Sequence, residues 1–183
     1  MAYNMKDVFY LDTQMVTGTS SGQGITTLDL SSYVDPIARG RAKGTGLAIY
    51  KVHFDIADSD GNSTYSASAT GQMRAAVISI SGAADAAVGS GSVSTNTLNA
   101  ANDLMIAGLD FSAGGTAAGD PAPNTFLEPS ADVPYVVVRD RVALILDIPT
   151  AMSVSAMVSV RLECAQVALD QATLNQLLRT QTV

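Results

Sequence analysis

The sequence predicts an all-β protein, a β-sandwich of eight strands with a short C-terminal helix, and two patterns carry this prediction. Residues 153–167 read SVSAMVSVRLECAQV, in which the even positions are apolar as far as Cys164 and the odd positions are mostly polar. A period of two sustained this long fits a strand, because a helix would spread the apolar side chains over all its faces. The second pattern is a series of short apolar runs separated by turn-rich segments without intervening helices, which is typical of sandwiches and barrels.

The other elements follow in chain order. Strands are expected at residues 8–17, 25–30, 47–57, 72–81, 104–111, 134–138, 142–148 and 153–167. The third strand ends at an Asp-Gly turn, which commonly joins paired strands. Two long connectors, 82–103 and 112–131, are poor in large apolar residues. We expect them on the outer face or at subunit contacts, because long loops in compact domains usually carry function or partner contacts.

The two longest one-sided strands are expected to share the core. The alternation in residues 47–57 places five side chains on one face: Ala48, Tyr50, Val52, Phe54 and Ile56. We expect Val158, Val160 and Leu162 of the last strand to be buried opposite that face, since both strands need cover for their apolar sides.

A short helix is expected at about residues 170–180, with Asp170 as its N-cap. Leu174, Leu177 and Leu178 follow at i, i+3 and i+4 and form a narrow apolar stripe. A helix this short is not stable by itself. The stripe should therefore pack on the domain's edge or make an assembly contact with a neighbouring subunit. We interpret residues 1–183 as a single sandwich domain whose short N-terminal arm, 1–7, also rests on protein.

The composition limits the class of protein. Charged residues make up 15% of the 183 residues, against about 25% in an average globular protein. Lys occurs at three positions, whereas a solvated monomer normally covers itself with Lys and Glu. The economical interpretation is a surface largely covered by other subunits; a plain Ser- and Thr-coated β protein is the alternative. A formal net charge of −7 argues against a body that grips nucleic acid.

Nothing in the sequence predicts export or a membrane span. Residues 1–10 are too polar for a signal peptide, and no apolar run is long enough to cross a bilayer. The single cysteine, Cys164, cannot form an internal disulfide. It falls on the apolar side of its strand and is interpreted as a small core residue. We therefore expect synthesis in the cytoplasm.

No motif predicts a catalytic, cofactor or metal site. Residues 18–22, GTSSG, match the G-x-S-x-G pattern of a nucleophile elbow, but they precede a strand, and a hydrolase would need a base near Ser20. His53, Asp55 and the Asp-rich turn at 58–62 resemble a metal site, yet the turn lacks the calcium-loop spacing and the closing Glu. One His without a Cys or His partner argues against zinc. We expect no enzyme, no cofactor and no small-molecule substrate; ion binding at the turn stays an open alternative.

Arg39, Arg41 and Lys43 form the basic cluster of the sequence, ARGRAKGTG. The cluster lacks the glycine spacing of a phosphate-binding loop. On an acidic chain it fits a contact with a neighbouring subunit's carboxylates, or with a polyanion such as a packaged genome or the anionic headgroups of an inner membrane. A solvated loop is the alternative.

Over residues 8–167 the chain resembles the single jelly-roll capsid proteins of icosahedral viruses. The resemblance rests on the number of strands, the chain length, the lack of a signal peptide and the low charge. The resemblance implies an eight-stranded jelly-roll-like β-sandwich in which two four-stranded sheets close over each other. It also implies a structural subunit of the virion capsid, made in the host cytoplasm, whose partners are copies of itself and other shell proteins. A glycan-binding sandwich or another virion or appendage component is the alternative, although the lack of Trp argues against glycan binding.

Overall fold

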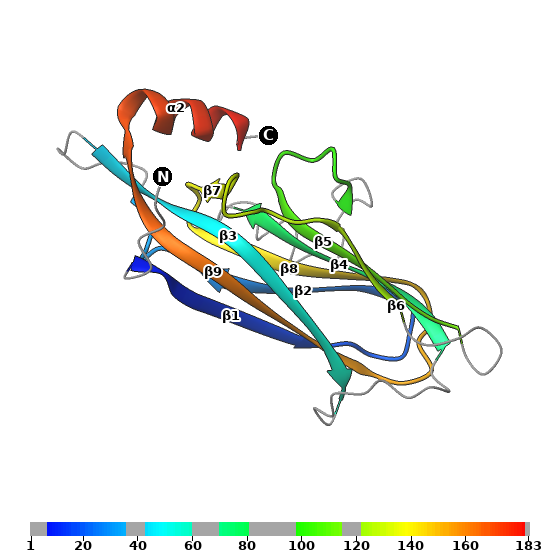
Figure 1. Cartoon of the computed structure of the whole chain (residues 1–183). Coiled ribbons are helices and arrows are strands. Elements are labelled where there is room, and N and C mark those ends of the chain that lie inside the picture. The colour runs from blue at the N-terminus through cyan, green and yellow to red at the C-terminus, as the bar shows by residue number, and fades with distance from the viewer. Residues whose placement is uncertain (1–6, 36–42, 60–69, 81–97, 115–121, 182–183) are drawn as a thin grey trace.

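The computed structural model describes residues 7–35, 43–59, 70–80, 98–114 and 122–181 (Figure 1). The elements, in chain order, are β1 (Phe9–Val16), β2 (Gly22–Asp29), β3 (Lys43–Asp58), β4 (Thr70–Ile80), β5 (Met105–Gly114), β6 (Ala122–Leu127), β7 (Tyr135–Val137), β8 (Arg141–Thr150), β9 (Ala156–Asp170) and α2 (Gln171–Thr180). The expected all-β sandwich with a short C-terminal helix is confirmed, with nine strands in the described part of the chain in place of eight.

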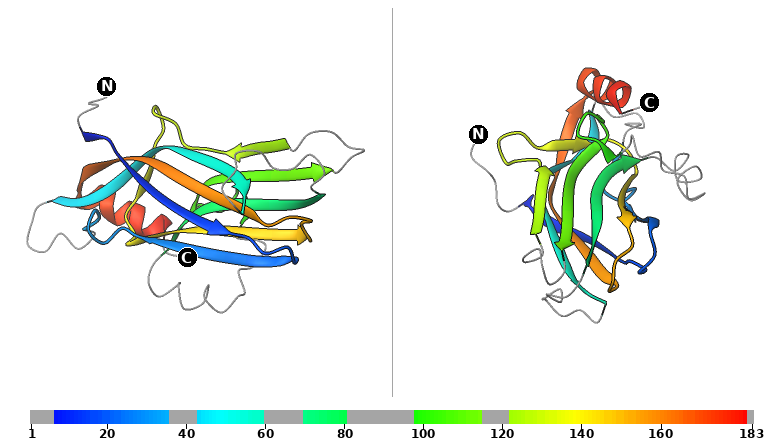
Figure 2. Two further views of the ribbon diagram at one scale, coloured as in Figure 1. Left: turned by 90° about the horizontal axis from the view of Figure 1, so that it is seen from below. Right: turned by 90° about the vertical axis from the view of Figure 1, so that its right-hand side faces the viewer.

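The strands form two antiparallel sheets, seen as two layers in Figure 2. Sheet A has the order β1-β9-β3-β7, and sheet B has the order β2-β8-β4-β5-β6. Pairs between the two halves of the chain alternate between the sheets: β1 with β9 in sheet A, β2 with β8 in sheet B, β3 with β7 in sheet A, and β4 with β5 in sheet B. A long hairpin rolled up in this way is a jelly roll, here with β6 added at one edge of sheet B.

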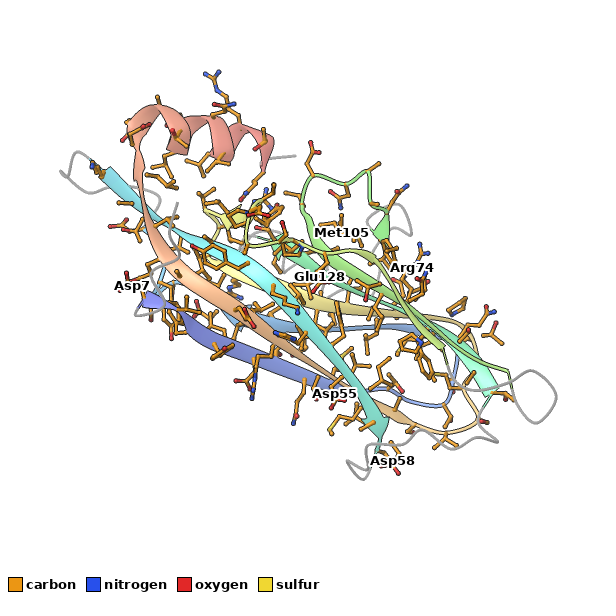
Figure 3. The ribbon with its side chains drawn as sticks, in the orientation of Figure 1. Asp7, Asp55, Asp58, Arg74, Met105 and Glu128 are labelled. Atoms are coloured by element: carbon orange, nitrogen blue, oxygen red, sulfur yellow. The ribbon has the colours of Figure 1, made fainter. Side chains whose placement is uncertain are left out.

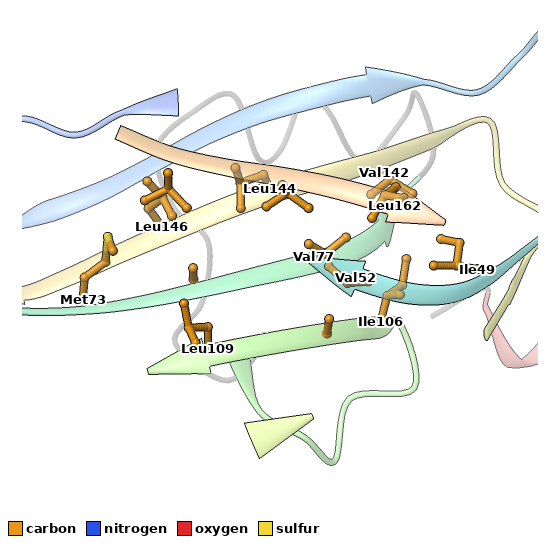
Figure 4. Close-up of a cluster of buried hydrophobic side chains, with 14 of the residues drawn as sticks. Ile49, Val52, Met73, Val77, Ile106, Leu109, Val142, Leu144, Leu146 and Leu162 are labelled. Atoms are coloured by element: carbon orange, nitrogen blue, oxygen red, sulfur yellow. The ribbon is translucent and has the colours of Figure 1, made fainter. Parts of the chain in front are cut away.

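The core lies between the two sheets, and β9 supplies much of its sheet A side. Val158, Val160 and Leu162 are at most 1% exposed, so their expected burial is confirmed. Leu144 and Leu146 of β8 belong to the same cluster and come from sheet B (Figure 4). A strand with one apolar face, buried at the centre of its sheet, explains the strict alternation of the sequence.

The expected facing of β3 is wrong in its first half. The register with β9 shifts between Ile49 and Lys51, which leaves Tyr50 as the extra residue of a β-bulge. A bulge exchanges the two faces of a strand. The inward side chains are therefore Leu47 and Ile49 before the bulge and Val52, Phe54 and Ile56 after it. Ala48 and Tyr50 leave the expected set, and Val52 lies beside Leu162 within sheet A instead of across the core.

The connector expected at 112–131 contains β6, which the sequence did not predict. Pro123 of β6 lacks an N–H, but β6 is an edge strand, where a missing donor breaks no ladder on its open side. In the other connector, 82–103, Leu98 is 2% exposed and packs on the outer face of sheet B. The end of this connector therefore contributes an apolar side chain to the domain itself. Residues 82–97 and 115–121 lie outside the described part.

The expected C-terminal helix is confirmed as α2, and it packs on its own domain. The Asp170 carboxylate accepts a hydrogen bond from the Thr173 N–H at 2.7 Å, as expected of an N-cap. Leu174 is fully buried with Val138 and Leu169. A Cβ added at Gly44 of β3 would stand 2.8 Å from the Leu174 Cδ2, so the absence of a side chain there lets the helix approach the sheet.

Gln181, directly after α2, fixes the end of the helix to β7. Its Nε2 donates to the Val136 carbonyl at 2.7 Å, and its Oε1 accepts from the Val138 N–H at 3.3 Å. The residue is 4% exposed. The amide side chain of Gln181 thus satisfies two backbone groups at the edge of sheet A. Buried backbone groups at a sheet edge need such a partner where no further strand pairs with them.

Candidate functional site

A groove of about 540 Å³ lies on the outer face of sheet B, around Arg74 of β4 (Figure 3). The β4–β5 register sets Arg74 beside Asp110. The guanidinium donates two hydrogen bonds to that carboxylate, at 2.6 and 2.7 Å, and a third to the Leu98 carbonyl at 3.2 Å. A bidentate pair of this kind orients both side chains. Arg74 therefore fastens the connector that precedes β5 to the sheet.

An aromatic ring completes the surroundings of Arg74. The β5–β6 register shifts between Gly108 and Leu109, so Phe126 is an extra residue in β6. Its ring lies over Gly108, in space that a side chain there would occupy. The Arg74 guanidinium stands 4.8 Å from the ring centroid, within the range of a cation–π contact.

The electrostatics of this groove do not favour an anionic ligand. The hydrogen bonds to Asp110 raise the pKa of Arg74, and the charge of nearby Asp147 acts in the same direction. One guanidinium thus stands between two carboxylates, and three of its five N–H donors are used within the chain. Gln72 and Asn124 add polar groups to the lining. The groove can hydrogen-bond a polar group, but the described residues hold no arrangement for general acid–base or nucleophilic chemistry there.

A second polar surface covers sheet A, on the side away from the core. We call it the open face of sheet A. It consists of Tyr10, Asp12, Gln14 and Val16 from β1, Met157, Ser159, Arg161 and Glu163 from β9, and Lys51, His53 and Asp55 from β3. A shallow depression of about 670 Å³ lies over it. The His53 Nε2 and the Glu163 Oε1 are 2.7 Å apart, and the Arg161 guanidinium stands 5.8 Å from the Tyr10 ring centroid.

The predicted basic cluster is described at one of its three positions. Lys43 is exposed at the start of β3, paired in register with Asp170. Arg39 and Arg41 lie outside the described residues, so the contact expected of this cluster stays a prediction. Of the predicted helix stripe, Leu174 is buried in the domain itself, whereas Leu177 and Leu178 are partly exposed. A contact of these two with a neighbouring subunit also stays a prediction.

The residues of the alternative catalytic and metal sites do not form such a site in the described part of the chain. Residues 18–22 lead from β1 into β2, a strand where a nucleophile elbow needs a helix. His53 is bonded to Glu163 on the open face of sheet A. No group of three metal-ligating side chains occurs within the described residues, although most of the turn at 58–62 lies outside them. Burial raises the pKa of Cys164 to about 12, with a smaller contribution from Glu163, so this thiol is a core group and not a thiolate nucleophile.

The sequence reasoning did not single out Arg74, Asp110 or Asp147. Arg74 and Asp110 are each the lone charged residue of their strand, and Asp147 shares β8 with Arg141 at the start of that strand. A charge in such a position needs a partner, because burying it unpaired is costly. An isolated charge in an apolar strand could have marked these residues. Their partners could not be predicted, because the sequence does not reveal that β4 pairs with β5 on one side and with β8 on the other.

Comparisons with known proteins give no relative. No family model matches the chain, and no curated protein matches it. Within the described residues, no helix has the length and apolar character needed to span a membrane.

Proposed function

We propose that this chain is a structural protein that assembles symmetrically into a shell, as a viral capsid subunit does. The jelly-roll order of the strands is the observation that supports this proposal most. The edges are β1 and β7 in sheet A and β2 and β6 in sheet B, and the two stacked sheets provide a rigid block with two broad faces. Fold alone is weak evidence of function, so the surface has to add to it.

The surface of this block is suited to contact with other subunits. The chain has ten Lys and Arg residues in 183, and charged residues of both signs make up 15% of it. Interface cores are likewise depleted in charge relative to the rest of a protein surface. In such a shell, the mechanism is geometric: the sandwich keeps its shape while its faces, loops and termini contact neighbours.

Self-association of the purified full-length chain tests the proposal. Sedimentation velocity over a concentration series, together with negative-stain electron microscopy, should give closed particles or a discrete symmetric oligomer. Light scattering at several salt concentrations should agree, because exposed charge contacts are screened over a Debye length of about 8 Å at physiological ionic strength. A monodisperse monomer up to millimolar concentration in every buffer would contradict the proposal.

A glycan-binding sandwich is the second candidate, and one observation favours it. The Tyr10 ring is 57% exposed on the open face of sheet A, beside Arg161 and hydrogen-bonding side chains. Exposed aromatic rings stack on sugar faces. A glycan array probed with the wild-type chain and with Tyr10→Ala distinguishes the candidates, since glycan binding should be lost in the variant. A lack of signal for any glycan rules this candidate out.

A further inference from the structure

The open face of sheet A is less covered by the chain's own described elements than the other outward surfaces, and the connector at 128–131 borders it beside Lys51 and Glu163. At the far end of the same sheet, α2 covers the outer side of β9 and β3. On sheet B, Leu98 and Phe126 pack over the outer side of the strands. Between these covered regions, β1, β9 and β3 lie side by side in front of sheet B in Figure 1. Their outward residues therefore form a continuous open surface of three strands.

Charge on this face is nearly balanced, unlike that of the whole chain. It carries three carboxylates, Asp12, Asp55 and Glu163, and two cations, Lys51 and Arg161, with His53 as a further basic group. The formal charge, with His neutral, is 2 − 3 = −1, against −7 for the whole chain. Two copies of an acidic protein repel each other over most of their surfaces. A face with interleaved positive and negative groups is where that repulsion is smallest.

The same face also exposes apolar side chains. The described residues include three large apolar side chains with high exposure, and two of them, Tyr10 at 57% and Val16 at 55%, project from β1 onto this face. The half-buried Met157 of β9 is the register partner of Val16. Tyr10 and Val16 stand at the two ends of β1, about 20 Å apart, with the charged positions between them. The apolar groups supply burial, and the charges supply register.

The register of the strands arranges the charges in rows. One row runs across the sheet as Tyr10, Glu163 and Lys51, and the next as Asp12, Arg161 and His53. Successive rows are about 7 Å apart, since a strand rises about 3.4 Å per residue. The central strand thus places an acidic side chain in one row and a basic side chain in the next.

This arrangement is complementary to itself at its β1 and β9 positions. If two copies stack face to face about a two-fold axis that runs across the strands between the rows, each row lies on the other row of the second copy. Arg161 then faces Glu163 of the second copy, and the symmetry repeats the contact. Tyr10 faces Asp12 of the second copy, where its hydroxyl can donate a hydrogen bond. Lys51 faces His53 of the second copy, so the attraction comes from β1 and β9 and not from β3. Such an isologous contact uses one patch twice.

We propose that the open face of sheet A is the contact by which two copies of this chain pair face to face in the assembly. The inference rests on the proposed shell function and names one of its interfaces. Eleven residues a side is fewer than the roughly 20–30 of a standard interface. The contact is therefore weak as an isolated dimer and acts together with other contacts of the assembly, which raise its effective concentration.

Two charge reversals test the pairing. Arg161→Glu makes positions 161 and 163 both acidic, and Glu163→Arg makes them both basic. Each variant alone replaces two attractive contacts by two repulsive ones. Each should raise the protein concentration for half-maximal association by about tenfold or more. An equimolar mixture of the two variants should associate again, because every mixed pair sets acidic against basic groups at both positions. The double variant, Arg161→Glu with Glu163→Arg, should regain association by itself.

Matched controls separate pairing from net charge and from folding. Arg179→Glu on α2 and Asp103→Arg, just before β5 of sheet B, make the same charge changes at exposed positions outside this face, and they should associate as the wild type does. Glu163→Arg also removes the contact with His53, so far-UV circular dichroism and thermal unfolding are compared for all variants. Rescue by mixing can come only from folded chains, which keeps the test valid if one variant is less stable.

The outcomes distinguish this inference from the shell proposal. If the wild type assembles and both single reversals assemble at the same concentration, the face is wrong and the shell proposal stands. If the single reversals fail and the mixture does not recover, pairing of this face with itself is wrong. A wild-type chain that stays monomeric overturns both. Glycan binding that Tyr10→Ala abolishes, with assembly unchanged, would assign the face to a glycan instead of a second copy.

Discussion

Gly108 and Phe126 provide a strong test of how sheet B is built. Gly108 lies in β5 under the ring of Phe126, the extra residue of the β6 bulge. A Cβ at position 108 would stand 2.7 and 2.8 Å from the two Cε atoms of that ring, far inside van der Waals contact. Gly108→Ala therefore forces the ring outward, away from the Arg74 guanidinium that now stands 4.8 Å from its centroid.

The cost follows from these contacts. Overpacking costs about 1–3 kcal/mol, and loss of an exposed cation–π contact costs about 0.5–1 kcal/mol. Replacing Gly by Ala also restricts the unfolded chain, which returns about 0.4–1 kcal/mol. We expect Gly108→Ala to lower the free energy of unfolding by about 1–3 kcal/mol. In a Phe126→Ala background the clash is absent, and the same substitution should be neutral or slightly stabilising.

Urea unfolding of the dilute chain, followed by circular dichroism, measures all four members of this double-mutant cycle. The expected coupling between positions 108 and 126 is at least about 1 kcal/mol, as is usual for residues in direct contact. An equal effect of Gly108→Ala in both backgrounds would refute the reasoning, because the clash with the ring would then not be the cause.

Three further predictions concern the core and the C-terminal end. Leu162→Ala should lower the free energy of unfolding by about 2–5 kcal/mol, and Leu162→Met by less than about 1.5 kcal/mol; equal losses in urea unfolding would contradict the packing shown for β9. Gln181→Ala removes two hydrogen bonds to backbone groups. It should cost about 1–3 kcal/mol in total and speed amide exchange in α2, so unchanged exchange would count against its role. The N–H of Thr173 holds the pKa of Asp170 below its ordinary value of 3.8. The stability from this cap is fully present above pH 3.8 and is lost as the pH falls through the lowered pKa. Thermal unfolding should show a deficit for Asp170→Ala at pH 7 that disappears in strong acid, and a deficit independent of pH would be inconsistent with the carboxylate as its source.

The periodicity of apolar residues and the capping residues predicted those elements whose apolar side chains all face the core or a covering element. β9 alternates because one of its sides lies in the core, and α2 begins at Asp170 because a carboxylate there caps the first turn. β6 escaped prediction because Pro and Gly surround it, and only its edge position makes Pro123 acceptable. The bulge at Tyr50 has no marker in the sequence: it depends on how β3 pairs with β9.

The candidate surfaces depend even more on pairing. In the sequence, Arg74 and Asp110 are separated by 36 residues, and nothing local relates them. The alternation of 153–167 did place Arg161 and Glu163 on one polar face. That Asp12 and His53 stand on either side of Arg161 follows from the order of β1, β9 and β3, which sequence periodicity does not contain. Side-chain direction was thus predictable from the sequence, whereas the identity of neighbouring strands was not.

The order of the strands also gives a physical reason why charge remains on sheet A. β9 is central, and its inward side is committed to the core from Ala156 to Cys164. Beyond Cys164 its other side is apolar, because α2 covers it there through Leu174 and its neighbours. Between residues 157 and 163 α2 does not cover that side, and there the strand carries Ser159, Arg161 and Glu163, the last bordered by the connector at 128–131. A long flat strand left open with apolar residues would invite uncontrolled association, and charges prevent it. When such charges alternate in sign along one strand, they also allow association in one register, which is the property that a subunit of a symmetric shell requires.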